Sequence, residues 1–301
     1  MTFAYILVTP ACNEEQYIET TIQCVTAQTV RPSKWVIVSD GSTDRTDEIV
    51  GGYAAKHDWI KLVKRPRQDH RSFASMVKAF NSGYQNAKSV RHDIVGKLDA
   101  DFAFESDYFE YLLNKFTLDP RLGVAGTPFM EEGCDSQKAG VFDREHVYGG
   151  CQLFRKECFE DIGGYPVVRA CSSVVANTTA RMRGWKTRCY TDMVCRHLRR
   201  LSTADQGLCA AKFEYGWKDY YLGNHPLWEV FRSVYQMKNE PRVLGGLLLL
   251  SGYVWSYMKR EKRDVPVELI QFRRNEQVRK LKSMFRNTLG RRDICPQPPD
   301  V

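Results

Sequence analysis

Short segments rich in apolar residues recur along the first hundred residues. They lie at residues 4–10, 34–40, 60–64 and 92–98. Segments in which apolar residues have the spacing of an amphipathic helix fill the intervals between them, and we expect the first helix to run from Asn13 to about Gln28. Strands that alternate with helices form βαβ units and a mainly parallel sheet. Helices on both faces of such a sheet explain why these segments are rich in apolar residues.

The pattern is less regular from residue 102 onward. We expect strands at 123–127 and 149–154, a helix that ends at Gly184, and a last strand over 186–195. These elements complete a predicted first domain of residues 1–206. We divide it into a nucleotide-sugar half, 1–101, and an acceptor half, 102–206.

Residues 207–301 differ in character, and we predict a helical, basic C-terminal extension. Residues 243–258 form an uncharged apolar run between Arg242 and the pair Lys259-Arg260. As a helix the run would span roughly 24 Å, less than the ~30 Å hydrocarbon core of a bilayer. Flanking aromatic and basic residues favour a segment that lies in the membrane interface. The alternative is a helix buried against the first domain.

The chain has 301 residues and a net charge of +8. Residues 259–292 carry twelve Lys and Arg against four Asp and Glu, so the excess lies in this tail. A basic tail on a neutral body favours an anionic membrane surface as partner, although it is also compatible with a solvated helix. The tail has no motif that would read nucleic acid specifically. The mean hydropathy of −0.44 excludes a polytopic membrane protein.

Three polar clusters follow predicted strands, at residues 9–15, 40–44 and 99–101. The carboxyl ends of parallel strands meet at one edge of a sheet, where ligands bind in such folds. Asp99 and Asp101 provide the oxygen ligands that a hard divalent cation prefers, and such a cation can bind a diphosphate. No G-x-G-x-x-G or P-loop motif is present, which argues against a dinucleotide-binding domain or an NTPase.

Together the segments TPACNEE, VSDGSTD and KLDAD resemble those of family 2 glycosyltransferases, which have the α/β GT-A fold. GGCQLFRKECFEDIGGYP and ARMRGWKT also resemble that family, so the resemblance covers roughly residues 4–200. It implies a nucleotide-diphosphate sugar as donor, with a UDP-sugar favoured over a GDP- or dTDP-sugar. It also implies Mg²⁺ or Mn²⁺ and an acceptor hydroxyl.

The resemblance assigns roles to individual positions. The implied donor-binding residues are Thr9, Pro10, Ala11, Glu14, Asp40, Ser42, Arg71 and Asp99, with Asn81 near the donor. The implied metal ligands are Asp101, Asp99 and His197. A metal and nearby cations would stabilise the charge that develops on the departing diphosphate.

The sequence departs from the family where the catalytic base is expected. Family members usually carry an acidic pair near positions 172–174, but this chain has no Asp or Glu between Asp161 and Asp192. The catalytic base is therefore unknown, and Asp143, Glu145 and Asp205 are the candidates. A reaction that needs no such base, or a domain that binds donor without efficient turnover, would also explain the difference.

We therefore expect a metal-dependent glycosyltransferase that acts on a lipid or nascent glycan. The alternative is a degenerate nucleotide-sugar-binding or scaffolding subunit of a glycan-assembly system. The short apolar run at the start has no basic lead and no cleavage site, so we expect a cytoplasmic protein, peripheral at the inner face of the cell membrane.

Overall fold

The structure is a computed structural model that describes residues 3–66, 73–131, 134–135, 143–199 and 207–290. It divides into two compact units, Met1–Asp205 and Gln206–Val301.

The first unit contains a seven-stranded sheet with the strand order β10-β6-β9-β4-β1-β2-β3. Its strands are β1 (Tyr5–Ala11), β2 (Lys34–Asp40), β3 (Ile60–Arg65), β4 (Ile94–Leu98), β6 (Leu122–Gly126), β9 (Cys151–Arg155) and β10 (Lys186–Cys189). Strands β1 to β4 pair in parallel, while β9 runs antiparallel to β4 and β6. The mainly parallel sheet predicted from the apolar runs is confirmed.

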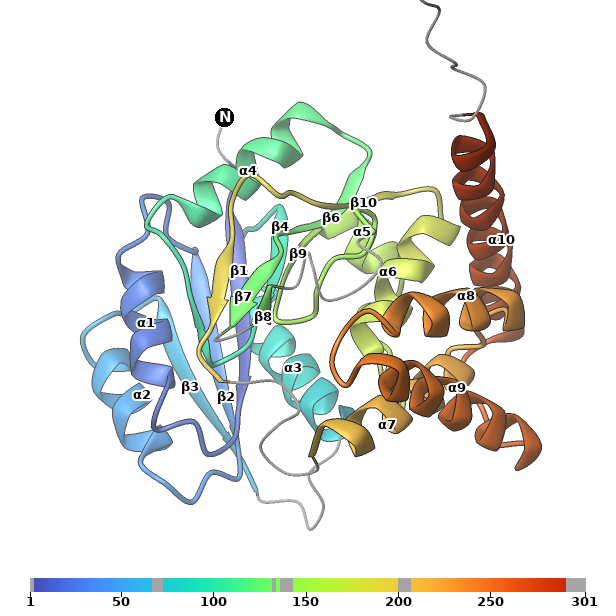
Figure 1. The fold of residues 1–301 in the computed structure, drawn as a ribbon. Coiled ribbons are helices and arrows are strands. Elements are labelled where there is room, and N and C mark those ends of the chain that lie inside the picture. The colour runs from blue at the N-terminus through green and yellow to red at the C-terminus, as the bar shows by residue number, and fades with distance from the viewer. Residues whose placement is uncertain (1–2, 67–72, 132–133, 136–142, 200–206, 291–301) are drawn as a thin grey trace, which may run out of the picture. The chain divides into compact units, whose positions relative to one another are not determined.

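Helices cover both faces of this sheet (Figure 1). Helices α1 (Ile18–Thr26), α2 (Thr46–Ala54) and α4 (Tyr108–Leu118) pack with Tyr5 and Leu7 of β1 on one face. Helices α3 (Phe73–Ala87), α5 (Lys156–Asp161) and α6 (Ser172–Met182) pack with Ile6 and Val8 on the other. Successive side chains of a strand point to opposite faces, so burial on both sides requires apolar residues at every position.

A second, four-stranded sheet has the order β5-β11-β7-β8. It consists of β5 (Phe102–Ala103), β7 (Phe129–Glu131), β8 (Cys134–Asp135) and β11 (Cys195–His197). The single strand predicted over 186–195 is wrong: β10 lies in the first sheet and β11 in the second. The chain bends between them near Asp192, whose Oδ2 accepts a hydrogen bond from the Tyr111 hydroxyl.

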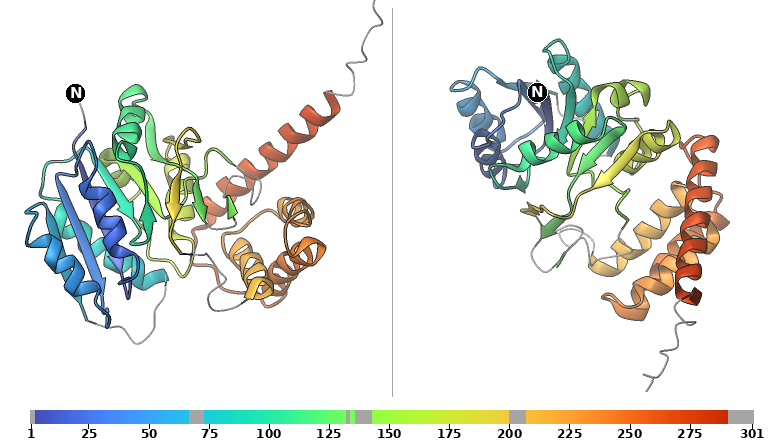
Figure 2. Two further views of the ribbon diagram at one scale, coloured as in Figure 1. Left: turned by 60° about the vertical axis from the view of Figure 1, so that its left-hand side comes forward. Right: turned by 90° about the horizontal axis from the view of Figure 1, so that it is seen from above.

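The second unit is helical, as predicted, with α7 (Gly207–Tyr221), α8 (Pro226–Gln236), α9 (Arg242–Met258) and α10 (Val267–Gly290), which Figure 2 shows in two further views. Helices α7 and α9 pack closely where Gly216 of α7 meets Gly252 of α9. The predicted apolar run forms α9. Within the described ranges, no helix is both long and apolar enough to cross a membrane.

Candidate functional site

The loop after β1 and the loop after β2 are joined by side-chain hydrogen bonds. Asn13 has a positive φ of 56°, and its Oδ1 accepts a hydrogen bond of 2.8 Å from the backbone N–H of Thr43. The backbone N–H of Glu14 donates to Thr46 Oγ1 at 2.8 Å. This loop continues to Ile18, so the helix that we predicted from Asn13 begins five residues later, at Ile18. The two polar clusters thus form one structure at the sheet edge.

The implied donor-binding residues on these loops have different environments. Thr9 is fully buried, and its Oγ1 accepts a hydrogen bond from Trp35 Nε1 at 3.0 Å, so its side chain belongs to the core. Pro10 and Ala11 end β1 and pair with the end of β2. The Ser42 hydroxyl accepts a hydrogen bond of 3.2 Å from the backbone N–H of Asn13.

Asp40 ends β2 and forms an ion pair with Arg65, the last residue of β3. Arg65 Nη1 lies 3.0 Å from Asp40 Oδ1, and both side chains are largely buried. The parallel register sets these two residues side by side. Arg65 therefore places a positive charge beside a carboxylate at the edge where the strands end.

Asp101 lies at the centre of a charged cluster that the sequence separates widely. His197 Nε2 lies 3.2 Å from Asp101 Oδ2, and His197 Nδ1 lies 3.4 Å from Glu131 Oε2. Arg199 pairs with Glu14, and its Nε lies 3.5 Å from Asp101 Oδ2. Strand β11 carries His197 beside β5, whose start follows Asp101 directly. The structure thus brings together the implied metal ligands Asp101 and His197.

The sequence analysis did not identify Glu131 or Arg199. Glu131 ends the three-residue strand β7, which has no clear sequence pattern. Arg199 follows His197 by two residues, which is the spacing of side chains on one face of a strand. This spacing was a weak sequence signal for Arg199.

Burial and charge act in opposite directions on the ionisable groups of this cluster. Burial disfavours the charged imidazolium of His197, but the carboxylates of Asp101 and Glu131 outweigh it and raise the His197 pKa. Burial raises the pKa of Asp99, which Lys97 partly offsets, while the neighbouring charge of Asp101 raises it further. The cluster therefore favours a positive charge near Asp101.

Asp99 is held by Lys97, a charged residue within the apolar strand β4. Lys97 Nζ lies 2.5 Å from both Asp99 Oδ1 and the carbonyl oxygen of Gly149. Lys97 is 3% exposed, so its ammonium group is shielded from solvent and is held by these two oxygens. A lysine in the middle of an apolar strand was the sequence signal for this contact, which we missed.

The segment in which the family carries its acidic pair begins α6. Ser172 is 2% exposed, and its Oγ has no hydrogen-bond partner within the described part of the chain. A Cβ at Gly149 would lie 2.8 Å from Ser173 Oγ, so the start of α6 packs against the segment that holds Lys97. The helix therefore starts beside Gly149 and brings no carboxylate to this segment.

The remaining candidates do not all fall on described residues. Asp143 Oδ1 accepts a hydrogen bond of 3.0 Å from the backbone N–H of Glu145. Asn81 Nδ2 donates to the carbonyl oxygen of Tyr165 at 3.5 Å. Arg71 and Asp205 lie outside the described residues.

The chemistry of these residues fits a divalent cation that is shared with a ligand. Asp101 and His197 present an oxygen and a nitrogen 3.2 Å apart. Among the described residues, no group of three or more His, Cys, Asp and Glu side chains could hold a metal without help. Mg²⁺ in particular is usually bound by one or two carboxylates together with substrate phosphates. Asp101 and His197 are therefore suited to a metal ion whose remaining coordination positions are filled by a diphosphate.

Comparisons with known proteins show what this chain is similar to. Residues 6–148 match the family model described as glycosyl transferase family 2. A poly-beta-1,6-N-acetyl-D-glucosamine synthase of Staphylococcus aureus (strain COL) is 26% identical in an alignment of length 196, which covers 58% of this chain and 45% of that protein. The chain therefore spans less than half the length of this curated relative.

Solved structures share the fold. The mannosyltransferase PcManGT from Pyrobaculum calidifontis, in complex with GDP-Man and Mn²⁺, aligns over 95% of this chain and 83% of its own, with a TM-score of 0.56 and 17% identity. S. aureus TarS aligns over 88% of this chain and 46% of its own, with a TM-score of 0.55 and 13% identity. Residues 6–148 are thus similar to glycosyl transferase family 2, and the first unit has the GT-A fold.

Proposed function

We propose that this chain is a metal-dependent glycosyltransferase that uses a nucleotide-diphosphate sugar, with a UDP-sugar as first choice. The observation that carries the proposal is the meeting of Asp101 and His197 at the edge where β1, β2 and β4 end. A structure of TarS residues 1–349 holds UDP-GlcNAc, and PcManGT holds GDP-Man and Mn²⁺. The nucleotide base of the donor and the identity of the metal ion can therefore both be tested directly.

Each group has a distinct role in this proposal. Asp101 and His197 would hold Mg²⁺ or Mn²⁺, which supplies positive charge where the diphosphate departs. Asp40 and the end of β1 would line the nucleoside. Arg199, which pairs with Asp101 and Glu14, would fix these carboxylates at their positions.

A second candidate function is donor binding with little or no turnover. Within the described residues, the carboxylates nearest the strand ends all contact a cationic side chain: Glu14, Asp40, Asp99, Asp101 and Glu131. An ion pair stabilises the ionised form of a carboxylate and makes it a weaker general base. Asp99 is the exception, because burial raises its pKa despite the contact with Lys97. Asp143, Glu145 and Asp205 remain the proposed sources of a base, and a retaining reaction would need none of them.

The proposed acceptor is a lipid or a growing glycan, and the proposed location of the protein is the cytoplasmic face of the cell membrane. Helix α9 exposes the large apolar residues Val243, Leu244, Leu247, Val254, Trp255, Tyr257 and Met258. Arg242 begins this helix and Lys259 follows it, with Lys259 Nζ 4.7 Å from the centre of the Trp255 ring. Exposed apolar residues bordered by aromatic and basic ones fit an anionic membrane surface.

The test is release and binding of donor across UDP-, GDP- and dTDP-sugars with Mg²⁺ or Mn²⁺. We expect metal-dependent binding of one donor, which Asp101→Asn weakens strongly. Loss of a residue that only supports a metal ligand already costs about 10- to 100-fold in metal affinity, so loss of a ligand costs at least as much. The exposed Asp58→Asn is the matched control.

Calorimetry measures binding, and detection of free nucleotide measures turnover. Release that depends on both metal and Asp101 supports the enzyme. Binding without release, with lipid and glycan acceptors present, supports the binding protein. Metal-dependent binding that is unchanged in Asp101→Asn would overturn the proposed metal role.

A further inference from the structure

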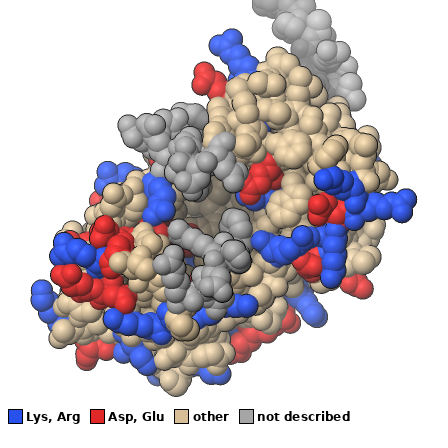
Figure 3. All heavy atoms as spheres, turned by 90° about the horizontal axis from the view of Figure 1, so that it is seen from below, with Lys and Arg blue, Asp and Glu red and all other residues tan. Residues whose placement is uncertain are grey.

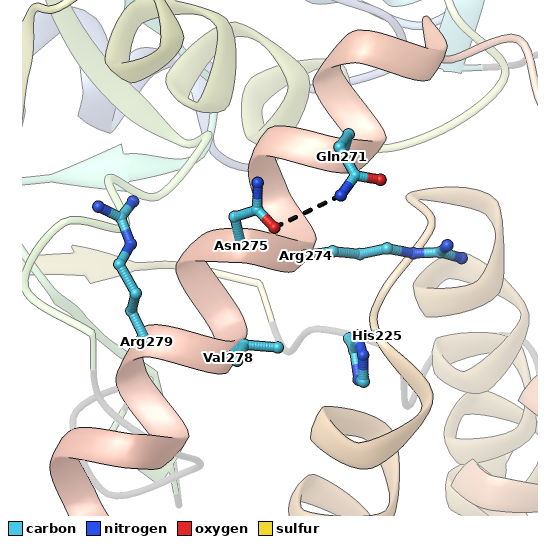
Figure 4. A pocket seen from close by; sticks show the side chains of 6 residues that line it. All are labelled: His225, Gln271, Arg274, Asn275, Val278 and Arg279. Carbon is cyan, nitrogen blue, oxygen red and sulfur yellow. Dashed lines mark hydrogen bonds between the residues drawn. The ribbon is translucent and has the colours of Figure 1, made fainter.

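The second unit contains a pocket of about 490 Å³ on one side of α10. Its lining residues are His225, Gln271, Arg274, Asn275, Val278 and Arg279. Figure 4 shows that all except His225 come from α10, and that His225 lies across from Arg274 and Val278. Three of the six side chains are basic or can become so, two are amides, and none is acidic.

The wall that carries His225 is held firmly by α10. The preceding residue, Asn224, is 1% exposed, and its Oδ1 accepts hydrogen bonds of 2.8 Å from Arg273 Nε and Gln277 Nε2. The backbone N–H of His225 donates to Gln277 Oε1 at 2.7 Å. The carbonyl oxygen of Asn224 also accepts from the Tyr253 hydroxyl, at 2.8 Å. A site built on such a wall needs little reorganisation on binding.

The hydrogen bonds leave donors available to the pocket. His225 Nδ1 accepts from the backbone N–H of Leu227 at 3.2 Å, so a neutral ring carries its proton on Nε2. Arg274 Nε donates to the carbonyl oxygen of Gly223 at 2.9 Å, which fixes the guanidinium and leaves its terminal NH₂ groups to other acceptors. Arginine at a fixed position binds phosphate oxygens well, because its planar fork matches their geometry.

An apolar surface begins next to the same histidine. Leu227, Val230 and Val234 are 66%, 49% and 57% exposed and occur at the spacing of one helix face. The first of them is the residue whose N–H contacts the His225 ring. A ligand that combines a phosphate group with a hydrocarbon chain would match both features, since the phosphate meets the donors and the chain covers the apolar side chains.

We propose that this pocket binds the phosphate group of an anionic lipid, whose chains lie along the exposed face of α8. The site belongs entirely to the second unit and does not require the glycosyltransferase reaction. It adds a specific headgroup site to the general attraction between a basic unit and an anionic surface. A free phosphate has the same headgroup chemistry, and the experiment separates the two.

The experiment measures binding of dihexanoyl phosphatidic acid and of inorganic phosphate to the full chain by calorimetry, at fixed ionic strength and below the lipid's micelle concentration. We expect the lipid to bind more tightly than inorganic phosphate. Arg274→Gln and Arg279→Gln should each weaken the lipid at least about tenfold, because each removes a charged hydrogen-bond donor. Arg286→Gln removes the same charge from an exposed position of α10 outside the pocket, and should have little effect.

A thermal melt and one further variant keep the test independent of folding. Arg274→Gln also removes the bond to Gly223, so a thermal melt accompanies it, whereas Arg279 is exposed. His225→Asn retains a side-chain acceptor at the start of α8 but withdraws the ring. Lipid affinity that is equal in the pocket variants and in Arg286→Gln would overturn the site. Equal affinity for inorganic phosphate and lipid would overturn the lipid as its ligand.

Discussion

Glu229 is a carboxylic acid fully enclosed by the second unit. Its side chain is 0% exposed, and Asn224 Nδ2 lies 3.4 Å from its Oε2. Burial raises the pKa of Glu229 from 4.5 to about 7, although the Asn224 contact and the charge of Arg273 oppose the shift. The folded protein therefore holds this proton over a pH range in which the unfolded chain releases it.

This shift predicts a pH dependence of stability. Between about pH 4.5 and 7 the folded state binds more protons than the unfolded state, so the free energy of unfolding falls as the pH rises. The loss is on the order of 3 kcal/mol between pH 4 and pH 8. Glu229→Gln should remove this contribution and be more stable than the wild type at pH 8. Urea titrations at both pH values measure it.

The control for Glu229→Gln is Glu268→Gln. It removes an exposed carboxylate from α10 and leaves the buried carboxyl of Glu229 in place. It should leave the difference between the two pH values as in the wild type. If Glu229→Gln also retains that difference, the carboxyl is not the group responsible.

Single residues also show how far the sequence can predict a site. Asp99 and Asp101 could be singled out because they follow an apolar strand directly. The pairing of Arg199 with Glu14, 185 positions apart, follows only from the three-dimensional path of β11. Thr9 was implied to bind donor, yet its hydroxyl bonds to Trp35, because the alternation along β1 directs its side chain into the core.

Helices and strands were predictable where one pattern of apolar and polar residues extends over several positions. Strands β1, β2 and β4 are buried along nearly their whole length, so their apolar runs identify them. Strands β5, β7, β8 and β11 have two or three residues each, too few for any pattern. These short strands form the sheet that positions His197 and Glu131, so the charged cluster around Asp101 depends on the least predictable elements. Helix α1 starts late because side-chain bonds hold residues 12–17 as a loop.

The contact between α7 and α9 depends on glycine. A Cβ at Gly252 would lie 2.1 Å from the carbonyl oxygen of Phe213, and a Cβ at Gly216 would lie 2.0 Å from that of Leu249. Backbone atoms cannot move away as a flexible side chain can. We expect Gly252→Ala to separate the helices and to destabilise the second unit by about 1–3 kcal/mol.

Thermal unfolding followed by circular dichroism measures this effect. Gly52→Ala in α2 is the matched control, because nothing lies within 4 Å of a Cβ at that position. Alanine is favoured over glycine in a helix by about 0.5–1 kcal/mol, so the control should be neutral or stabilising. Equal melting temperatures for both variants would contradict the close packing of α7 and α9.

The excess positive charge of the molecule and the exposed apolar residues of α8 and α9 occur in the same unit. On the face drawn in Figure 3, Lys and Arg lie among Asp and Glu and broad areas of uncharged residues, so this face has no single-sign patch. The excess positive charge belongs to residues 259–292, and the exposed apolar residues of α8 and α9 belong to the same unit. These properties predict membrane binding with an electrostatic and an apolar part.

Vesicle flotation can separate the two parts. We expect the chain to float with phosphatidylglycerol vesicles and to be partly released by salt, since the Debye length falls from about 30 Å at 0.01 M to about 3 Å at 1 M. Leu244 is 51% exposed on α9, and Leu244→Asp should lower the salt-resistant fraction. Leu118→Asp, at a position 79% exposed in the first unit, makes the same chemical change and should bind as the wild type does. Equal losses in both variants would mean that an added negative charge, and not insertion of α9, weakens binding, and would contradict an interfacial role for this helix.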